Sequence, residues 1–129
     1  MTEAVIVSTA RTPLCKSWRG ALNMTHGAKM GGHVVHAALE RAKLEPQEVE
    51  DVIMGSALQQ GATGSNVARQ IALRAGLPVT TSGMTMDRQC SSGLMAVATA
   101  AKQIVHDGMS CVIGGGLESG SYGRKRQHP

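Results

Sequence analysis

The chain has 129 residues, enough for one small domain but not two, and its lack of phenylalanine, with one tryptophan and one tyrosine, requires an aliphatic core. Its net charge of +4 comes largely from residues 120–129, because removing the three basic residues there leaves ten basic against nine acidic residues. A nearly neutral body without interleaved basic and aromatic residues argues against nucleic-acid binding as the main function.

The cysteines and the N-terminus bear on the compartment. Cys15, Cys90 and Cys111 are odd in number and form no CxxC pair, which argues against a disulfide framework and favours a reducing environment. Glu3 directly precedes the apolar residues 4–7, unlike the start of a signal or transit peptide. No run approaches the roughly 18 apolar residues of a membrane span. We therefore expect a cytoplasmic protein without a membrane partner.

The first half of the chain predicts a strand, a loop, a helix and a second strand. The continuous apolar run at 4–8 is typical of a strand buried on both faces, and 9–24 is rich in turn-forming residues. A helix over 25–43 begins at the candidate cap Thr25 and carries an apolar stripe opposite a polar one. The apolar segment 52–57 predicts the second strand.

The second half predicts a helix that begins at the candidate cap Asn66 and ends before Gly76. The three consecutive glycines at 114–116 lack the lysine and the spacing of a phosphate-binding loop and predict a tight turn. The alternation of elements predicts an α/β fold with a mostly parallel sheet and right-handed crossovers. The remaining expected elements are a strand at 81–86, a helix at 90–106 and a strand at 110–114.

Cys90 is the candidate nucleophile, because it follows a strand and a polar turn and stands where the next helix begins. A thiol at a helix N-terminus faces unsatisfied backbone N–H groups and the positive end of the helix dipole, and both favour the thiolate. The alternative is a buried cysteine with only a packing role, which is the commoner place of a free cysteine.

Four segments in order along the chain resemble the thiolases, the acyltransferases that make or cleave 3-ketoacyl-CoA. The segment around Cys90 resembles the family's acyl-cysteine motif, although thiolases usually carry Asn, Ser or Thr at the position of Asp87. Aspartate also serves as an N-cap, so this departure is minor. The other segments that resemble the family are 10–13, 60–78 and 114–119.

The resemblance implies the fold of the first of two similar thiolase halves. It predicts an incomplete N-terminal domain over 1–119, with a βαβαβαβ layer that lacks its last strand and the second half. Residues 120–129 contain no aliphatic residue and no periodicity, so they are expected to form a basic tail outside the family pattern. The Gly-rich loop at 61–66 resembles the segment that thiolases pack at their dimer interface.

The resemblance also implies a reaction. Cys90 would attack the thioester carbonyl of an acyl-CoA and hold the acyl group, while its own backbone N–H contributes to an oxyanion site. Acetyl-CoA would then accept the acyl group to give 3-ketoacyl-CoA and CoA, and the reverse reaction would cleave a 3-ketoacyl-CoA. Coenzyme A thioesters are substrates in this reaction, and no permanently bound cofactor is implied. The residues that bind coenzyme A are not identified by the sequence.

The family places the activating histidine, in a Gly-His-Pro context, and a second cysteine, in a Cys-x-Gly context, in the second half. His128 precedes Pro129 but follows Gln127, so this dipeptide is a coincidence. His33 and His36 lie on the polar stripe of their helix, and two ligands alone rarely hold a metal. We therefore expect no metal site, and we expect this truncated chain to be inactive, without measurable turnover.

Two alternatives stay open. Segment 87–92 also resembles the ketosynthase-like condensing enzymes, which differ from thiolases in taking acyl groups from acyl carrier protein. The chain could instead be a non-catalytic fragment that pairs with a full-length thiolase subunit. The resemblance implies a homodimer or homotetramer for the intact family members.

Overall fold

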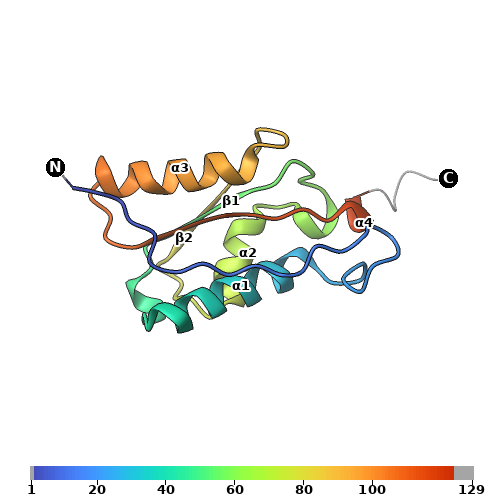
Figure 1. Ribbon diagram of the computed structural model, residues 1–129, viewed down its shortest axis with the longest axis horizontal. Helices are drawn as coiled ribbons and strands as arrows, with labels where there is room; N and C mark the ends of the chain where they lie inside the picture. Colours follow the sequence, from blue (N-terminus) through green and yellow to red (C-terminus); the bar gives the residue numbers. More distant parts are fainter. Residues whose placement is uncertain (1, 124–129) are drawn as a thin grey trace.

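The computed structural model describes residues 2–123, which form three layers (Figure 1). A sheet of three parallel strands has the order β2-β1-β3, with β1 (Asp51–Gly55) in the centre between β2 (Ser82–Met86) and β3 (Val112–Gly116). The helices α1 (Gly27–Ala42) and α2 (Val67–Arg74) cover one face, and α3 (Ser92–Val105) covers the other. The predicted α/β class with a parallel sheet is confirmed. The short elements are η1 (Pro46–Glu48), η2 (Gly61–Thr63) and α4 (Gly120–Gly123).

The strand order explains why α2 and α3 lie on opposite faces. The connection from β1 through α2 leads to one neighbour of β1, and the connection from β2 through α3 returns across the sheet to the other neighbour. Right-handed crossovers that run in opposite directions place their helices on opposite faces. The loops after β1 and β2 therefore diverge at the carboxyl edge of the sheet, where open α/β sheets bind their ligands.

The core follows the two-residue period of the central strand. All five residues of β1 are buried, and Val52 and Met54 pack with α1 and α2 while Ile53 packs with Ala96 and Ala100 of α3. Both faces of β1 are thus covered by helices, as expected for the centre of a parallel sheet.

Local hydrogen bonds define the ends of the helices on the α1/α2 face. His26, and not the predicted Thr25, caps α1, since its Nδ1 atom accepts a hydrogen bond from the N–H of Ala28 at 3.1 Å. Gly76 follows α2 with φ +87°, and the N–H groups of Gly76 and Leu77 bond back to the helix, which confirms the predicted C-terminal glycine.

The predicted strand at 4–8 is not present. These residues lie in no strand or helix, and Val5, Ile6 and Val7 are exposed by 67%, 77% and 68%. The apolar run gives the residues a tendency to form a strand, but among residues 2–123 no neighbouring strand pairs with them. Figure 1 shows the segment as an extended trace leading to α1, to which it is tied by a hydrogen bond from Arg41 to the carbonyl of Thr9.

The first residues of the predicted basic tail, 120–123, are ordered as a helix, which the sequence did not predict. Residues 120–123 form the short helix α4, and Ser121 is buried. The hydroxyl of Ser121 accepts a hydrogen bond of 2.8 Å from the N–H of Trp18, so a contact with the N-terminal loop orders this segment. Residues 124–129 lie outside the described part of the chain.

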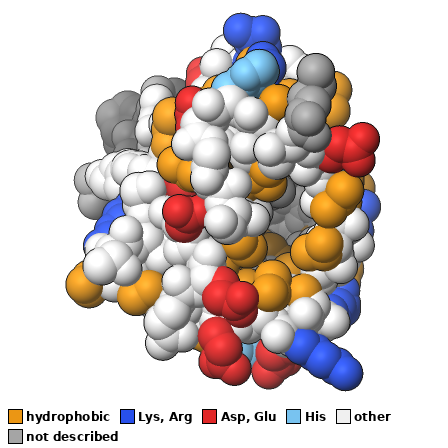
Figure 2. Space-filling view, turned by 90° about the vertical axis from the view of Figure 1, so that its left-hand side faces the viewer, with side chains coloured by type: hydrophobic (Ala, Val, Ile, Leu, Met, Phe, Trp, Pro, Cys, Tyr) orange, Lys and Arg blue, Asp and Glu red, His pale blue; other side chains and the backbone are white. Residues whose placement is uncertain are grey.

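The outer side of α3 exposes apolar side chains. Leu94 and Val97 are exposed by 76% and 39%, although the sequence of this helix lacks a clear polar face and predicts burial on several sides. Figure 2 shows hydrophobic groups among the polar and charged surface on one face of the molecule. Within residues 2–123, no helix has both the length and the apolar character that a membrane crossing requires.

The first turn of α3 packs directly on the end of β1. A side chain at Gly55 would overlap the backbone of Ser92 and Gly93, so the helix reaches this position only because Gly55 has no Cβ atom. Gly114 in β3 has the same role further along, since a Cβ atom there would lie 2.9 Å from the Cα atom of Val97. The glycines at 114–116 therefore lie in a strand under a closely packed helix, and the predicted tight turn is wrong.

We expect Gly55→Ala to lower the free energy of unfolding by about 3 kcal/mol, because the backbone of α3 must move to make room. Gly93→Ala is the matched control, since its new Cβ atom would lie 3.5 Å from the nearest atom, an ordinary contact. Urea denaturation followed by circular dichroism measures both variants. Equal stability of the two would contradict the close packing of α3 on β1.

Candidate active site

Cys90 lies at the carboxyl edge of the sheet, in a cavity of about 590 Å³. The cavity is built from the loops that follow all three strands, which bring together parts of the chain far apart in sequence. Those loops contribute Ala57 and Leu58 after β1, Gln89 and Cys90 after β2, and Leu117 and Glu118 after β3. The cysteine thus occupies the place where a parallel α/β sheet presents ligand-binding and catalytic groups.

A tight turn between β2 and α3 presents the cysteine. Asp87 accepts a hydrogen bond of 2.8 Å from the N–H of Gln89 through its Oδ1 atom, and Gln89 has a left-handed backbone with φ +49°. The predicted role of Asp87 as a helix cap is therefore wrong, because α3 begins only at Ser92. Asp87 instead stabilises the turn itself by the bond to the backbone two residues on, which aspartate commonly forms.

Ser92 fixes the turn from its other end, and sequence reasoning did not assign it a role. Its buried hydroxyl accepts a hydrogen bond from the N–H of Arg88 at 2.7 Å and donates one to the carbonyl of Gln89 at 2.6 Å. Ser91 adds a bond of 2.9 Å to the carbonyl of Arg88. Two serines directly after a cysteine were the available signal, since hydroxyls near helix starts commonly bond to the backbone.

Cys90 is exposed, while Cys15 and Cys111 are partly buried. The alternative of a buried packing cysteine is therefore wrong for Cys90. Cys111 precedes β3 at the opposite, amino edge of the sheet. Burial raises the pKa of the Cys111 thiol, and the carboxylates of Glu48 and Glu50 raise it further.

None of the histidines in the described part of the chain lines the Cys90 cavity. His33 and His36 are exposed on α1, and His36 pairs with Glu40 at 3.1 Å. His26 caps α1, and His106 follows the far end of α3. His128 lies outside the described residues. Residues 2–123 contain no group of three His, Cys, Asp or Glu side chains arranged to hold a metal ion.

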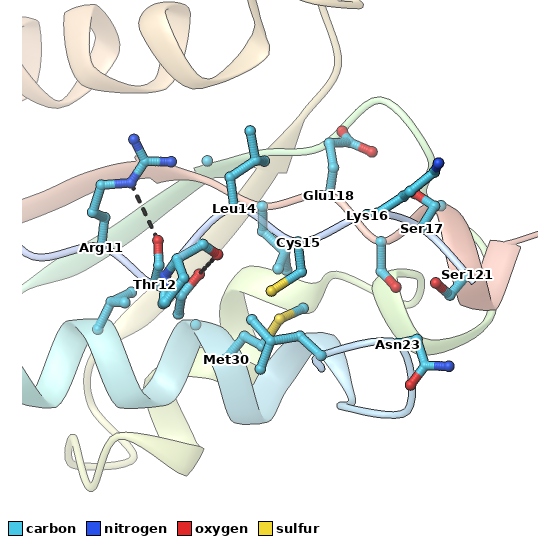
Figure 3. A pocket seen from close by; sticks show the side chains of 18 of the residues that line it. Arg11, Thr12, Leu14, Cys15, Lys16, Ser17, Asn23, Met30, Glu118 and Ser121 are labelled. Carbon is cyan, nitrogen blue, oxygen red and sulfur yellow. Dashed lines mark hydrogen bonds between the residues drawn. The ribbon is translucent and has the colours of Figure 1, made fainter. Parts of the chain in front are cut away.

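A second cavity of about 270 Å³ lies beside the first (Figure 3). It is enclosed by residues 10–17, by α1 and by the residues that follow β3. The side chains of Cys15 and Met30 point toward each other in it (Figure 3). Glu118 lines both cavities and therefore belongs to the wall between them. The sequence motif at 10–13 thus lies next to the motif at 114–119 in space.

We expect iodoacetamide at about pH 8 to alkylate Cys90 at least about tenfold faster than Cys111. Cys90 is exposed, whereas the raised pKa of Cys111 leaves a smaller fraction of that thiol ionised. The difference should narrow as the pH rises through the pKa of Cys111. Peptide mass spectrometry over a time course gives both rates in one sample, and faster reaction of Cys111 would contradict this account.

Comparison with known proteins identifies the family. The thiolase N-terminal domain matches residues 4–128, so the boundary predicted at residue 119 falls inside this match. The acetyl-CoA acetyltransferases of Cupriavidus necator and Escherichia coli are 45% and 43% identical to the chain over 119 residues. Each alignment covers 92% of this chain and 30% of the relative, so the chain spans about a third of the length of these proteins.

A 3-ketoacyl-CoA thiolase of Bacillus subtilis is 41% identical over the same length, again covering 92% of this chain and 30% of the relative. The crystal structure of the Bacillus anthracis acetyl-CoA acetyltransferase matches with a TM-score of 0.88 and 35% identity, covering 100% of this chain and 35% of that one. Sequence and fold agree over the same region. The chain belongs to the thiolase family and corresponds to the family's N-terminal domain.

Proposed function

We propose that Cys90 accepts acyl groups from coenzyme A thioesters as the first step of a thiolase reaction. The observation that carries this proposal is the exposed Cys90 thiol, held by a hydrogen-bonded turn in a cavity at the carboxyl edge of the sheet. The thiolate attacks the thioester carbonyl, the bond to the sulfur of coenzyme A breaks, and coenzyme A leaves as a thiolate. One thioester replaces another, so the step is nearly thermoneutral.

The backbone N–H of Cys90 would stabilise the negative oxygen of the tetrahedral intermediate. Transfer of the acyl group to a deprotonated acetyl-CoA would complete the synthesis of a 3-ketoacyl-CoA. The thiolase resemblance places the histidine that activates the nucleophile, and the second cysteine that moves the substrate proton, in the other half. We therefore expect acyl exchange at Cys90 to be slow in the 129-residue chain and complete condensation to be absent. In a complete family member, this domain would work within a dimer or tetramer.

Isotope exchange tests this function, because it requires only the first step. The chain should move the acetyl group from acetyl-CoA to labelled coenzyme A, and Cys90→Ala should lower the exchange rate to that of buffer. Cys111→Ala is the matched control and should retain the rate, since Cys111 lies at the opposite edge of the sheet. Exchange that survives Cys90→Ala would refute the assignment of the nucleophile.

A second candidate function is pairing with a full-length thiolase subunit. The exposed apolar side chains of Leu94 and Val97 on α3 favour it, because covering apolar surface with another protein lowers the free energy. The tagged chain should then retain a full-length relative during affinity purification, and the double substitution Leu94→Lys, Val97→Lys should abolish retention. Separate elution of the two proteins would exclude pairing.

A further inference from the structure

Glu118 joins two of the three loops that form the Cys90 cavity. It lies two residues beyond β3, and its Oε1 atom accepts a hydrogen bond from the N–H of Ala57, two residues beyond β1. The carboxylate therefore bridges the loops that leave adjacent strands at the same edge of the sheet. Figure 3 shows its side chain beside the segment that carries Cys15 and Lys16.

The segment held by Glu118 is also bonded to the base of the cysteine turn. Ser56, next to Ala57, donates a backbone hydrogen bond of 2.9 Å to the carbonyl of Met86. Met86 is the last residue of β2, and the turn with Cys90 follows directly. On the other side, the N–H of Leu117 donates a bond of 2.9 Å to Gly55. Residues 55–57 thus connect the end of β3 with the start of the cysteine turn.

Glu118 adds a side-chain hydrogen bond to these backbone hydrogen bonds. The bonds of Gly55 and Ser56 are formed by backbone groups that every residue type has, whereas the bond of Ala57 requires the side chain at position 118. A bond from an N–H to a carboxylate is charge-assisted and stronger than one between neutral groups. Beyond Ala57 the chain becomes exposed, with Leu58 exposed by 45%, and the carbonyl of Leu58 accepts hydrogen bonds from the Thr63 hydroxyl and the Gln60 N–H. The bond to Glu118 is therefore the one that ties this loop to the residues after β3 at Ala57.

We propose that Glu118 is a positioning residue that holds residues 56–58 as the wall of the Cys90 cavity. Through this wall it sets the approach of a coenzyme A thioester to Cys90, a consequence that rests on the proposed function. Glu118 acts through the Ala57 N–H and takes no part in the chemistry itself. Its loss should therefore affect a large, oriented substrate more than a small reagent that reaches the exposed thiol from solution.

Three variants separate the hydrogen bond from the charge. Glu118→Ala removes the acceptor and should lower acetyl-CoA exchange about tenfold, the effect of losing one hydrogen bond to a charged group. Glu118→Gln keeps an amide oxygen that can accept from Ala57, so it should stay within about threefold of the wild type. Glu40→Ala is the matched control, since this exposed glutamate on α1 pairs with His36, away from the Cys90 cavity, and its loss should leave exchange unchanged.

Two further readouts test positioning directly. Alkylation of Cys90 by iodoacetamide should change less than about twofold in Glu118→Ala, because the thiol is exposed in either case. Amide hydrogen exchange at Ala57 should become about tenfold faster in Glu118→Ala and remain slow in Glu118→Gln. Equal Ala57 exchange in the wild type and Glu118→Ala would overturn the proposal, as would a Glu118→Gln variant as impaired as Glu118→Ala.

The acetyl-CoA exchange and Ala57 amide exchange measurements also separate the positioning role of Glu118 from the proposed function of Cys90. A wild-type chain that shows no acetyl-CoA exchange at all would refute the proposed function. The Ala57 amide would then still decide whether Glu118 holds the wall. Normal acetyl-CoA exchange in Glu118→Ala would refute the positioning role and leave the function of Cys90 intact.

Discussion

The close approach of α3 to the end of β1 is the constraint on which the site depends. Gly55 has no side chain, so the backbone of Ser92 and Gly93 can lie directly against it. This contact fixes the first turn of the helix, and the buried Ser92 hydroxyl then fixes the turn that carries Cys90. The position of Cys90 is therefore determined by backbone contacts and by the side chains of Asp87, Ser91 and Ser92, which hold the turn before any substrate binds.

Three parallel strands end at the same edge, and each contributes one loop to the cavity around Cys90. The connections through α2 and α3 cross opposite faces of the sheet. The loops that lead from β1 and β2 into these connections therefore diverge, which opens the space between them. Hydrogen bonds between the loops, from Ser56 to Met86 and from Ala57 to Glu118, keep that space defined. The geometry of the cavity around Cys90 is thus a direct consequence of the strand order.

The sequence alone predicted the α/β class and most helices and strands, because periodicity and end signals such as Gly76 act locally. It also singled out Cys90, whose place after a strand and a polar turn is a local property. The prediction of a strand at 4–8 was wrong because a strand needs a neighbouring strand to pair with, and the sequence of this segment carries no information about such a partner. The role of Glu118 depends on a contact with Ala57 across the fold, so no local pattern could have supplied it. The hydrogen bonds of Ser92 are local, and the two serines after Cys90 were the signal that could have indicated them.

The central claim is that this fold presents Cys90 as an acyl acceptor. Its most direct test is to mix the wild-type chain with acetyl-CoA, quench in acid and locate the acetyl group by peptide mass spectrometry. The account predicts one acetyl thioester, on the peptide that contains Cys90, which hydroxylamine removes at neutral pH. An acetyl group on Cys15 or Cys111 in preference to Cys90, or none on any cysteine, would contradict it.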